Sequence, residues 1–244
     1  MNRLTKRELA VLTFIARVGV AQPSHLMQRF QFSRATAYRR VETLSELGLI
    51  AATEYNLGSV ETFAATRAGI AMAELPLRVA NPTWFSLTHD LAMTHVVAEL
   101  ESLTVDCVTE REMIAFRRIE GSDRYLFQVK RTSSRSATTH RADIVCEIPG
   151  YNKFIAVEVE LSPKNNFRWD SYLQGYANRV GQDGFIGVLY LVGARSEYKR
   201  LATRASHSSL GDRFQLLRLG EENMLDGLAE VIRADGARAE RRAA

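Results

Sequence analysis

Three acidic side chains in two neighbouring β-type segments are the residues best suited to do chemistry. Glu158 and Glu160 lie two apart in the run 154–161, so on a strand they point to the same side, about 7 Å apart. Asp143 lies in the preceding run, and the Pro-Gly pair at 149–150 predicts that the two runs form a hairpin. If Asp143 faces the glutamates, the three carboxylates suit a hard divalent cation such as Mg²⁺. The alternative is an edge strand with a solvated acidic face.

Such a set of carboxylates could cleave a phosphodiester. The reaction needs charge neutralised on the phosphate, an activated nucleophile and a stabilised leaving oxygen, which one or two Mg²⁺ or Mn²⁺ ions can supply. Asp143 and Glu158 would hold the ion, and Glu160 would be a further ligand or would orient water. The histidines show no metal-ligand spacing, and the chain lacks the HxH signature that accompanies a nucleophilic tyrosine in another kind of strand-cutting enzyme.

The elements before these residues predict a separate N-terminal domain at 1–80. A capping box at Thr5-Lys6-Arg7-Glu8 begins one helix, and Ser33 caps another. The predicted elements are helices at 5–19, 22–30 and 34–47, a two-stranded wing within 50–65, and a helix at 66–75. Three helices followed by a hairpin is the order of a winged helix-turn-helix domain.

The third helix of this domain has a face typical of DNA recognition. Ala37, Val41 and Leu44 repeat at helical spacing and form the inward stripe. The outward side chains are positively charged or can form hydrogen bonds, which suits the major groove; they are Arg34, Thr36, Arg39, Arg40 and Thr43. The alternative is a winged helix used for protein contacts, with the arginines as ordinary solvated charges.

The second domain is expected at 88–233, after an irregular connection at 76–87. The fold class is therefore α+β, with a winged helix followed by an α/β domain. The predicted elements are a helix capped by Thr88, a strand near 105–117, a basic hairpin or loop through His140, the acidic hairpin, a helix at 165–180, a buried strand at 185–192, a helix at 196–206, a strand at 214–219 and a helix at 221–233. The tail at 234–244 is expected to be mobile.

Charge and composition point to a polyanion as partner. The chain has 244 residues and a net charge of +4, and its basic excess lies within residues 1–80. A second basic cluster at 117–142 includes Arg131 and Arg135, which are placed to hold phosphates beside the acidic hairpin.

Cysteine usage and the lack of long apolar runs predict a cytoplasmic protein with no membrane partner. Cys107 and Cys146 lie in apolar β-type runs, which favours buried free thiols. No apolar run approaches the roughly 18 residues of a membrane span, and the N-terminus lacks the apolar core of a signal peptide.

The order of helices and strands predicted for the second half of the chain resembles that of the restriction-endonuclease-like, or PD-(D/E)XK, nuclease fold. Arg141-Ala142-Asp143 followed by Glu158-Val159-Glu160 is similar to its motif, although Ala142 stands where proline is usual and Glu160 where lysine is usual. That lysine steadies the nucleophile or the phosphate. Lys164, four residues further on, could replace it only if the strand ends before Lys164.

Together with the winged helix, four short motifs resemble the replication-relaxation family, and within it the MobC-type plasmid mobilisation relaxases. The motifs are His89-Asp90-Leu91-Ala92, Thr109-Glu110-Arg111-Glu112, Arg141-Ala142-Asp143 and Glu158-Val159-Glu160-Leu161-Ser162. The resemblance implies a relaxase that binds double-stranded and locally single-stranded DNA at a transfer origin and nicks one strand. It also implies Asp143, Glu158 and Glu160 as metal ligands, and an auxiliary mobilisation or coupling protein as partner.

Two other functions compete with this one. The first is a DNA-binding regulator without catalysis, whose degenerate nuclease-like domain dimerises or binds a partner; the missing motif lysine favours it. The second is a general restriction enzyme, which would cut both strands at many sites.

Overall fold

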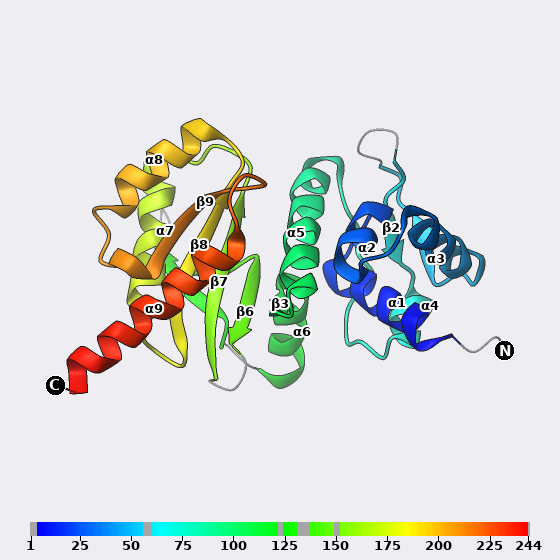
Figure 1. Ribbon diagram of the computed structural model, residues 1–244, viewed down its shortest axis with the longest axis horizontal. Helices are drawn as coiled ribbons and strands as arrows, with labels where there is room; N and C mark the ends of the chain where they lie inside the picture. The colour runs from blue at the N-terminus through cyan, green and yellow to red at the C-terminus, as the bar shows by residue number, and fades with distance from the viewer. Residues whose placement is uncertain (1–3, 56–59, 122–123, 131–136, 149–151, 244) are drawn as a thin grey trace. The chain divides into compact units, whose positions relative to one another are not determined.

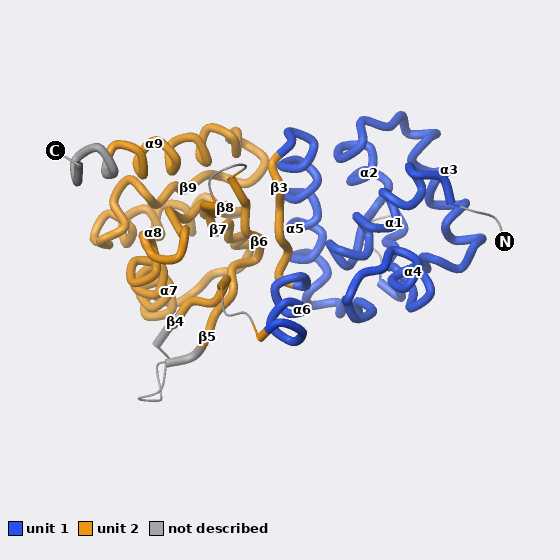
Figure 2. Tube along the Cα trace, turned by 90° about the horizontal axis from the view of Figure 1, so that it is seen from below, with its two compact units in different colours: residues 1–104, 111–120 blue, residues 105–110, 121–244 orange. Residues whose placement is uncertain are grey.

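The computed structural model describes residues 4–55, 60–121, 124–130, 137–148 and 152–243 (Figure 1). The chain forms two compact units, which are drawn in different colours in Figure 2. Unit 1 comprises residues 1–104 and 111–120, and unit 2 comprises residues 105–110 and 121–244.

Unit 1 begins with the predicted order of three helices and a wing, which is confirmed. Its first elements are α1 (Lys6–Val18), α2 (Pro23–Phe30), α3 (Arg34–Glu46), β1 (Ile50–Ala52), β2 (Phe63–Ala65) and α4 (Arg67–Met72). The capping box at Thr5 and Glu8 and the Ser33 cap are both present, because these side chains satisfy backbone N–H groups of the first helical turns. β1 and β2 pair antiparallel, and Ala21 bridges to Phe63 beside them.

The helix after the wing belongs to unit 1, which corrects the predicted boundary between 80 and 88. α5 (Trp84–Ser102) is capped by Thr83 rather than Thr88, so it begins inside the expected connection. Its Leu87 and Leu91 are buried in one apolar cluster with Val20 and Ala64. Burial of these leucines therefore fixes where the helix starts and which unit it joins.

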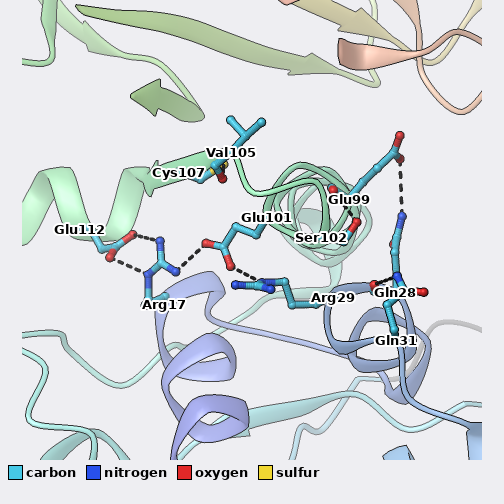
Figure 3. Close-up of polar contacts among 10 residues, drawn as sticks. All are labelled: Arg17, Gln28, Arg29, Gln31, Glu99, Glu101, Ser102, Val105, Cys107 and Glu112. Carbon is cyan, nitrogen blue, oxygen red and sulfur yellow. Dashed lines mark hydrogen bonds and ion pairs between the residues drawn. The ribbon is translucent and has the colours of Figure 1, made fainter. Parts of the chain in front are cut away.

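A partly buried ion-pair network around Glu101 fastens α5 and α6 (Glu110–Glu120) to the first two helices of unit 1 (Figure 3). Glu101 of α5 is buried and accepts hydrogen bonds from Arg17 at 2.6 Å and from Arg29 at 2.5 Å. Arg17 also donates to Glu112 at 2.7 Å. Removing one member of such a pair is strongly destabilising, because the opposite charge then stays buried without a partner.

Unit 2 is built on a mixed five-stranded sheet in the order β3-β6-β7-β8-β9. The strands are β3 (Asp106–Thr109), β6 (Ile144–Ile148), β7 (Lys153–Glu160), β8 (Phe185–Val192) and β9 (Phe214–Arg218). β3, β6 and β7 pair antiparallel, whereas β7, β8 and β9 pair parallel. The predicted acidic hairpin is therefore confirmed as β6–β7, and β7 lies at the centre of the sheet.

Helices cover the two faces of the sheet, as the alternation of side chains along β8 shows. Tyr190 contacts the ring of Trp169 on α7 (Asn166–Arg179). The preceding residue, Leu189, points to the other face, where Gly227 of α9 (Met224–Ala243) approaches it so closely that a Cβ there would meet its side chain at 2.8 Å. A separate hairpin, β4 (Leu126–Lys130) with β5 (Ala137–Arg141), contacts α7 through Phe127 and Tyr176. α8 (Arg195–Ala205) connects β8 to β9.

Two further boundaries differ from the sequence predictions. The strand expected near 105–117 ends at Thr109, because the residues after it are mostly strong helix formers and continue as α6. The tail expected to be mobile at 234–244 is instead helical to Ala243, within α9. In that segment Asp235 pairs with Lys153 of β7 at 2.7 Å. This ion pair links the second half of the helix to the sheet.

The remaining general predictions concern thiols and membranes. Cys107 and Cys146 are free and buried, as predicted. Across the described ranges, none of the helices combines the length and apolarity that a membrane span requires.

Candidate functional site

The exposed side of α3 borders a groove within unit 1. The inward stripe is confirmed, because Ala37, Val41 and Leu44 are all buried. The groove has a volume of about 900 Å³ and lies between α3 and the wing; it is lined by Pro23, Ala35, Tyr38, Arg39, Val41, Glu42, Ser45, Val60, Glu61 and Phe63. Arg39 is therefore the predicted DNA-contacting residue that lines this groove.

The other predicted DNA-contacting residues of α3 have different surroundings. Arg34 is exposed and lies over the ring of Tyr38, at 5.5 Å from its centroid. Arg40 is held inside the unit by an ion pair with Glu8 at 2.8 Å. Thr36 and Thr43 are half-buried; the Thr36 hydroxyl lies 2.9 Å from that of Ser33, and the Thr43 hydroxyl donates to the backbone oxygen of Arg39. Arg131 and Arg135 lie outside the described residues.

Glu158 and Glu160 are buried, so the alternative of a solvated acidic face is wrong. Their exposed fractions are 5% and 3%, because β7 is a central strand and not an edge. Carboxylates are rarely buried to this degree without a partner, since the loss of water disfavours their charge. The contacts of each glutamate therefore decide what the site can do.

Glu158 is held between a histidine and a tyrosine. His140 of β5 places its Nε2 at 2.8 Å from Glu158 Oε1, and the hydroxyl of Tyr176 on α7 donates to the same oxygen. Burial and the charge of Glu158 raise the pKa of Tyr176 well above its ordinary value, so the phenol keeps its proton. Burial is the largest influence on the pKa of His140 and lowers it, but the charge and hydrogen bond of Glu158, together with the charge of Asp143, raise the pKa above its usual value.

Glu160 has a different set of donors. Its Oε1 accepts from the backbone N–H of Ser162 at 3.1 Å and from the Ser162 hydroxyl at 3.2 Å. Its Oε2 forms an ion pair with Lys164. β7 ends at Glu160, so the condition set for Lys164 to enter the site is met. Lys164 Nζ also lies 5.1 Å from the ring centroid of Trp169, and burial lowers the pKa of this lysine.

Asp143 joins the site from the start of β6. Its Oδ2 accepts from the backbone N–H of Val159 at 2.8 Å, between the two glutamates of β7. The backbone N–H of Glu110 donates to the Asp143 carbonyl at 3.0 Å. Burial, followed by the charge of Asp143, raises the pKa of Glu110. Four carboxylates of unit 2 therefore lie around the open end of the β6–β7 hairpin, opposite its turn.

These carboxylates do not fit a metal centre in their present arrangement. Among the described residues, no group of three or more histidine, cysteine, aspartate or glutamate side chains is arranged to hold a metal ion. His140 and Tyr176 both contact Oε1 of Glu158, and the two oxygens of Glu160 contact Ser162 and Lys164. The structure thus brings the predicted residues to one end of one strand, but with each glutamate in its own set of contacts.

Two buried polar groups beside the carboxylates lack a hydrogen bond. The Tyr190 hydroxyl and Trp169 Nε1 have no hydrogen-bond partner among the described residues, although both side chains are almost fully buried. Tyr190 pairs with Glu158 in the parallel register of β7 and β8, which places the two side chains on the same face. Unsatisfied buried groups of this kind are typical of places where water, an ion or a substrate binds.

The sequence reasoning missed several residues at these places. His140 and Tyr176 contact Glu158, and Tyr38 and Glu42 line the groove beside Arg39. Some signals were present: His140 lies three residues before Asp143, and Glu42 lies one helical turn after Arg39. Tyr176 gave no such signal, because its contact with Glu158 depends on how α7 crosses the sheet.

Comparisons with known proteins identify no family for this chain. No family model matches it, and no curated protein matches it. Among solved structures, Lactococcus lactis ZitR, described as a zinc-responsive MarR family member, aligns with 19% identity and a TM-score of 0.28, over 43% of this chain and 77% of ZitR. A C30AH42A mutant of ZitR aligns with 19% identity and a TM-score of 0.27, over 30% of this chain and 49% of the mutant, so the chain spans about half the length of that match. Scores this low do not establish a shared fold.

We predict that the pKa of His140 depends on Glu158 and not on Glu160. In Glu158→Gln the ion pair is lost while burial remains, so the pKa should fall from above its usual value of about 6.5 to below it. Glu160→Gln removes a carboxylate two residues away, whose ion pair is with Lys164, and should leave the pKa of His140 raised. Titration of the histidine ring resonances by NMR measures both.

The raised pKa of His140 also determines how the stability of unit 2 changes with pH. Because the folded pKa of His140 exceeds the unfolded one, the His140–Glu158 pair stabilises unit 2 fully below about pH 6.5, and this contribution is lost as the pH rises through the folded pKa. An unchanged His140 pKa in Glu158→Gln would contradict the assignment.

Proposed function

We propose that this chain binds double-stranded DNA through α3 and the wing. The observation that carries the proposal is the position of Arg39, which is exposed, lines the groove beside the wing and forms no side-chain hydrogen bond or ion pair with another described residue. Arg34 extends the same basic surface at the start of the helix. A helix with an inward apolar stripe and outward arginines, next to a hairpin, suits the major groove of a duplex.

We further propose that unit 2 nicks one DNA strand at the Glu158 site, as a relaxase acting at a plasmid transfer origin. The support is the arrangement of the sheet, in which an antiparallel β6–β7 hairpin continues through α7 into a parallel β8, with buried carboxylates where β7 ends. Lys164 adds a positive charge at this end. An acidic site beside a lysine is the set of groups that phosphodiester cleavage uses.

A requirement for Mg²⁺ or Mn²⁺ accompanies the nickase proposal. Asp143, Glu158 and Glu160 would be the ligands. To bind through Oε1, Glu158 would have to release His140 or Tyr176, and Glu160 would have to release Lys164 or Ser162. Metal binding would thus compete with contacts that stabilise the folded unit.

The second candidate is a DNA-binding regulator that does not cleave. The observation that favours it is that Glu158 and Glu160 already have protein donors, so their burial needs no metal to balance it. In this case the polar network at the end of β7 is structural. DNA binding by unit 1 is common to both candidates.

We predict that Arg39→Ala weakens duplex binding and lowers its salt dependence. If Arg39 contacts a phosphate, the slope of log affinity against log salt should fall by about one; if it contacts a base, affinity should fall roughly tenfold or more for the preferred sequence. Fluorescence anisotropy with labelled duplexes at several salt concentrations measures both quantities.

The matched control is Arg7→Ala, which removes the same charge from the exposed surface of α1 in the same unit. It should change binding much less than Arg39→Ala. Equal losses for the two variants would mean that only net charge matters and would contradict a role for α3.

We predict that nicking depends on the Glu158 carboxylate. Supercoiled plasmid carrying the cognate transfer origin should be nicked by the wild-type chain with Mg²⁺ or Mn²⁺, and should remain supercoiled with chelator or with Glu158→Gln, which keeps the shape of the side chain. Glu221→Ala, on the exposed surface of unit 2, is the control and should nick normally. Agarose gels separate the nicked and supercoiled forms, and equal activity of wild type and Glu158→Gln would rule out this site.

A further inference from the structure

The groove beside α3 contains an acidic residue where duplex binding would favour basic ones. Glu42 lies one helical turn after Arg39, is exposed and lines the groove. A carboxylate that faces a DNA backbone is repelled by the phosphates, so its presence on this surface weakens nonspecific binding. Another role must account for it if α3 enters a groove of DNA.

Glu42 has no basic partner among the described residues. Neither Glu42 nor Arg39 forms a side-chain hydrogen bond or ion pair with a described residue, although their spacing on the helix would allow a pair. The adjacent arginine behaves differently, because Arg40 is paired with Glu8. Unit 1 thus binds one arginine of α3 internally and leaves Arg39 and Glu42 available on the same side.

The edges of DNA bases can donate a hydrogen bond to the Glu42 carboxylate, which phosphates cannot do. In the major groove the N4 amino group of cytosine donates a hydrogen bond, which a glutamate can accept, whereas the O6 and N7 atoms of guanine accept from an arginine. Two side chains one helical turn apart can reach neighbouring base pairs. A free arginine and a free glutamate at this spacing therefore match adjacent guanine and cytosine edges.

We propose that Glu42 is a specificity-determining residue, which selects a cytosine beside a guanine read by Arg39. The inference rests on the proposed binding of duplex DNA by α3. The Glu42 carboxylate lowers the affinity of the protein for most DNA sequences. The affinity is restored only where a cytosine amino group donates a hydrogen bond to Glu42. Tyr38, which is 43% exposed, also lines the groove.

The test compares the base preferences of three full-length proteins. Wild type, Glu42→Gln and Glu61→Gln are used to select duplexes from a random-sequence pool, and the affinities for the selected site and for its single-pair variants are then measured. Glu61→Gln is the matched control, because it removes the same charge from the wing side of the same groove. Circular dichroism confirms that each variant is folded.

The expected result is a change of preference at one base pair. Wild type should prefer cytosine there by about tenfold, and Glu42→Gln should prefer adenine, because an amide matches the N6 and N7 atoms of adenine. Glu61→Gln should keep the wild-type preference. Loss of the cytosine preference in both variants, or its survival in Glu42→Gln, would overturn the inference about Glu42. Neither result would contradict the proposed binding of duplex DNA. If wild type binds no duplex, the proposed function fails, and the inference fails with it.

Discussion

The burial of two carboxylates at the end of a central strand is the constraint on which unit 2 depends. Glu158 and Glu160 can be charged there only because donors reach them from other parts of the unit. For Glu158 the donors come from the β4–β5 hairpin and from α7, and for Glu160 they come from the segment that follows β7. The network thus fixes the hairpin, the helix and the sheet at one place, whether or not that place also cleaves DNA.

Unit 1 uses its charges in two different ways. Inside the unit, Glu101 binds Arg17 and Arg29, and Glu8 binds Arg40, so these charges hold helices together. On the exposed side of α3, Arg39 and Glu42 have no such partners among the described residues and line a groove beside the wing. The contrast between paired and unpaired charges on one helix separates structural residues from those available to a ligand.

Local signals predicted the local parts of the fold. The caps at Thr5 and Ser33 and the Pro-Gly turn depend on residues a few positions apart, and the elements they mark are present. The start of α5 was misplaced because Thr83 and Thr88 are both acceptable caps, and only the burial of Leu87 selects the first. Helicity beyond residue 233 was missed because the apolar pattern stops there, although the helix itself does not.

The site around Glu158 and Glu160 was predicted only in part, because local spacing does not show contacts that tertiary packing creates. The spacing of Glu158 and Glu160 sufficed to place them on one face, but their partners His140 and Tyr176 come from elements whose position follows from tertiary packing. The expected three-carboxylate metal set assumed that the oxygens lacked other donors. The donors of Glu158 are each 18 residues away in the sequence, so no local pattern shows them.

The most direct test of this network is a double-mutant cycle between Glu158 and Tyr176. Unfolding free energies of wild type, Glu158→Gln, Tyr176→Phe and the double variant give the coupling between the two side chains, independently of their separate effects. A coupling of about 1–3 kcal/mol is predicted for a buried hydrogen bond to a charged carboxylate. Additive effects, with a coupling near zero, would show that Tyr176 does not hold Glu158 and would contradict the account.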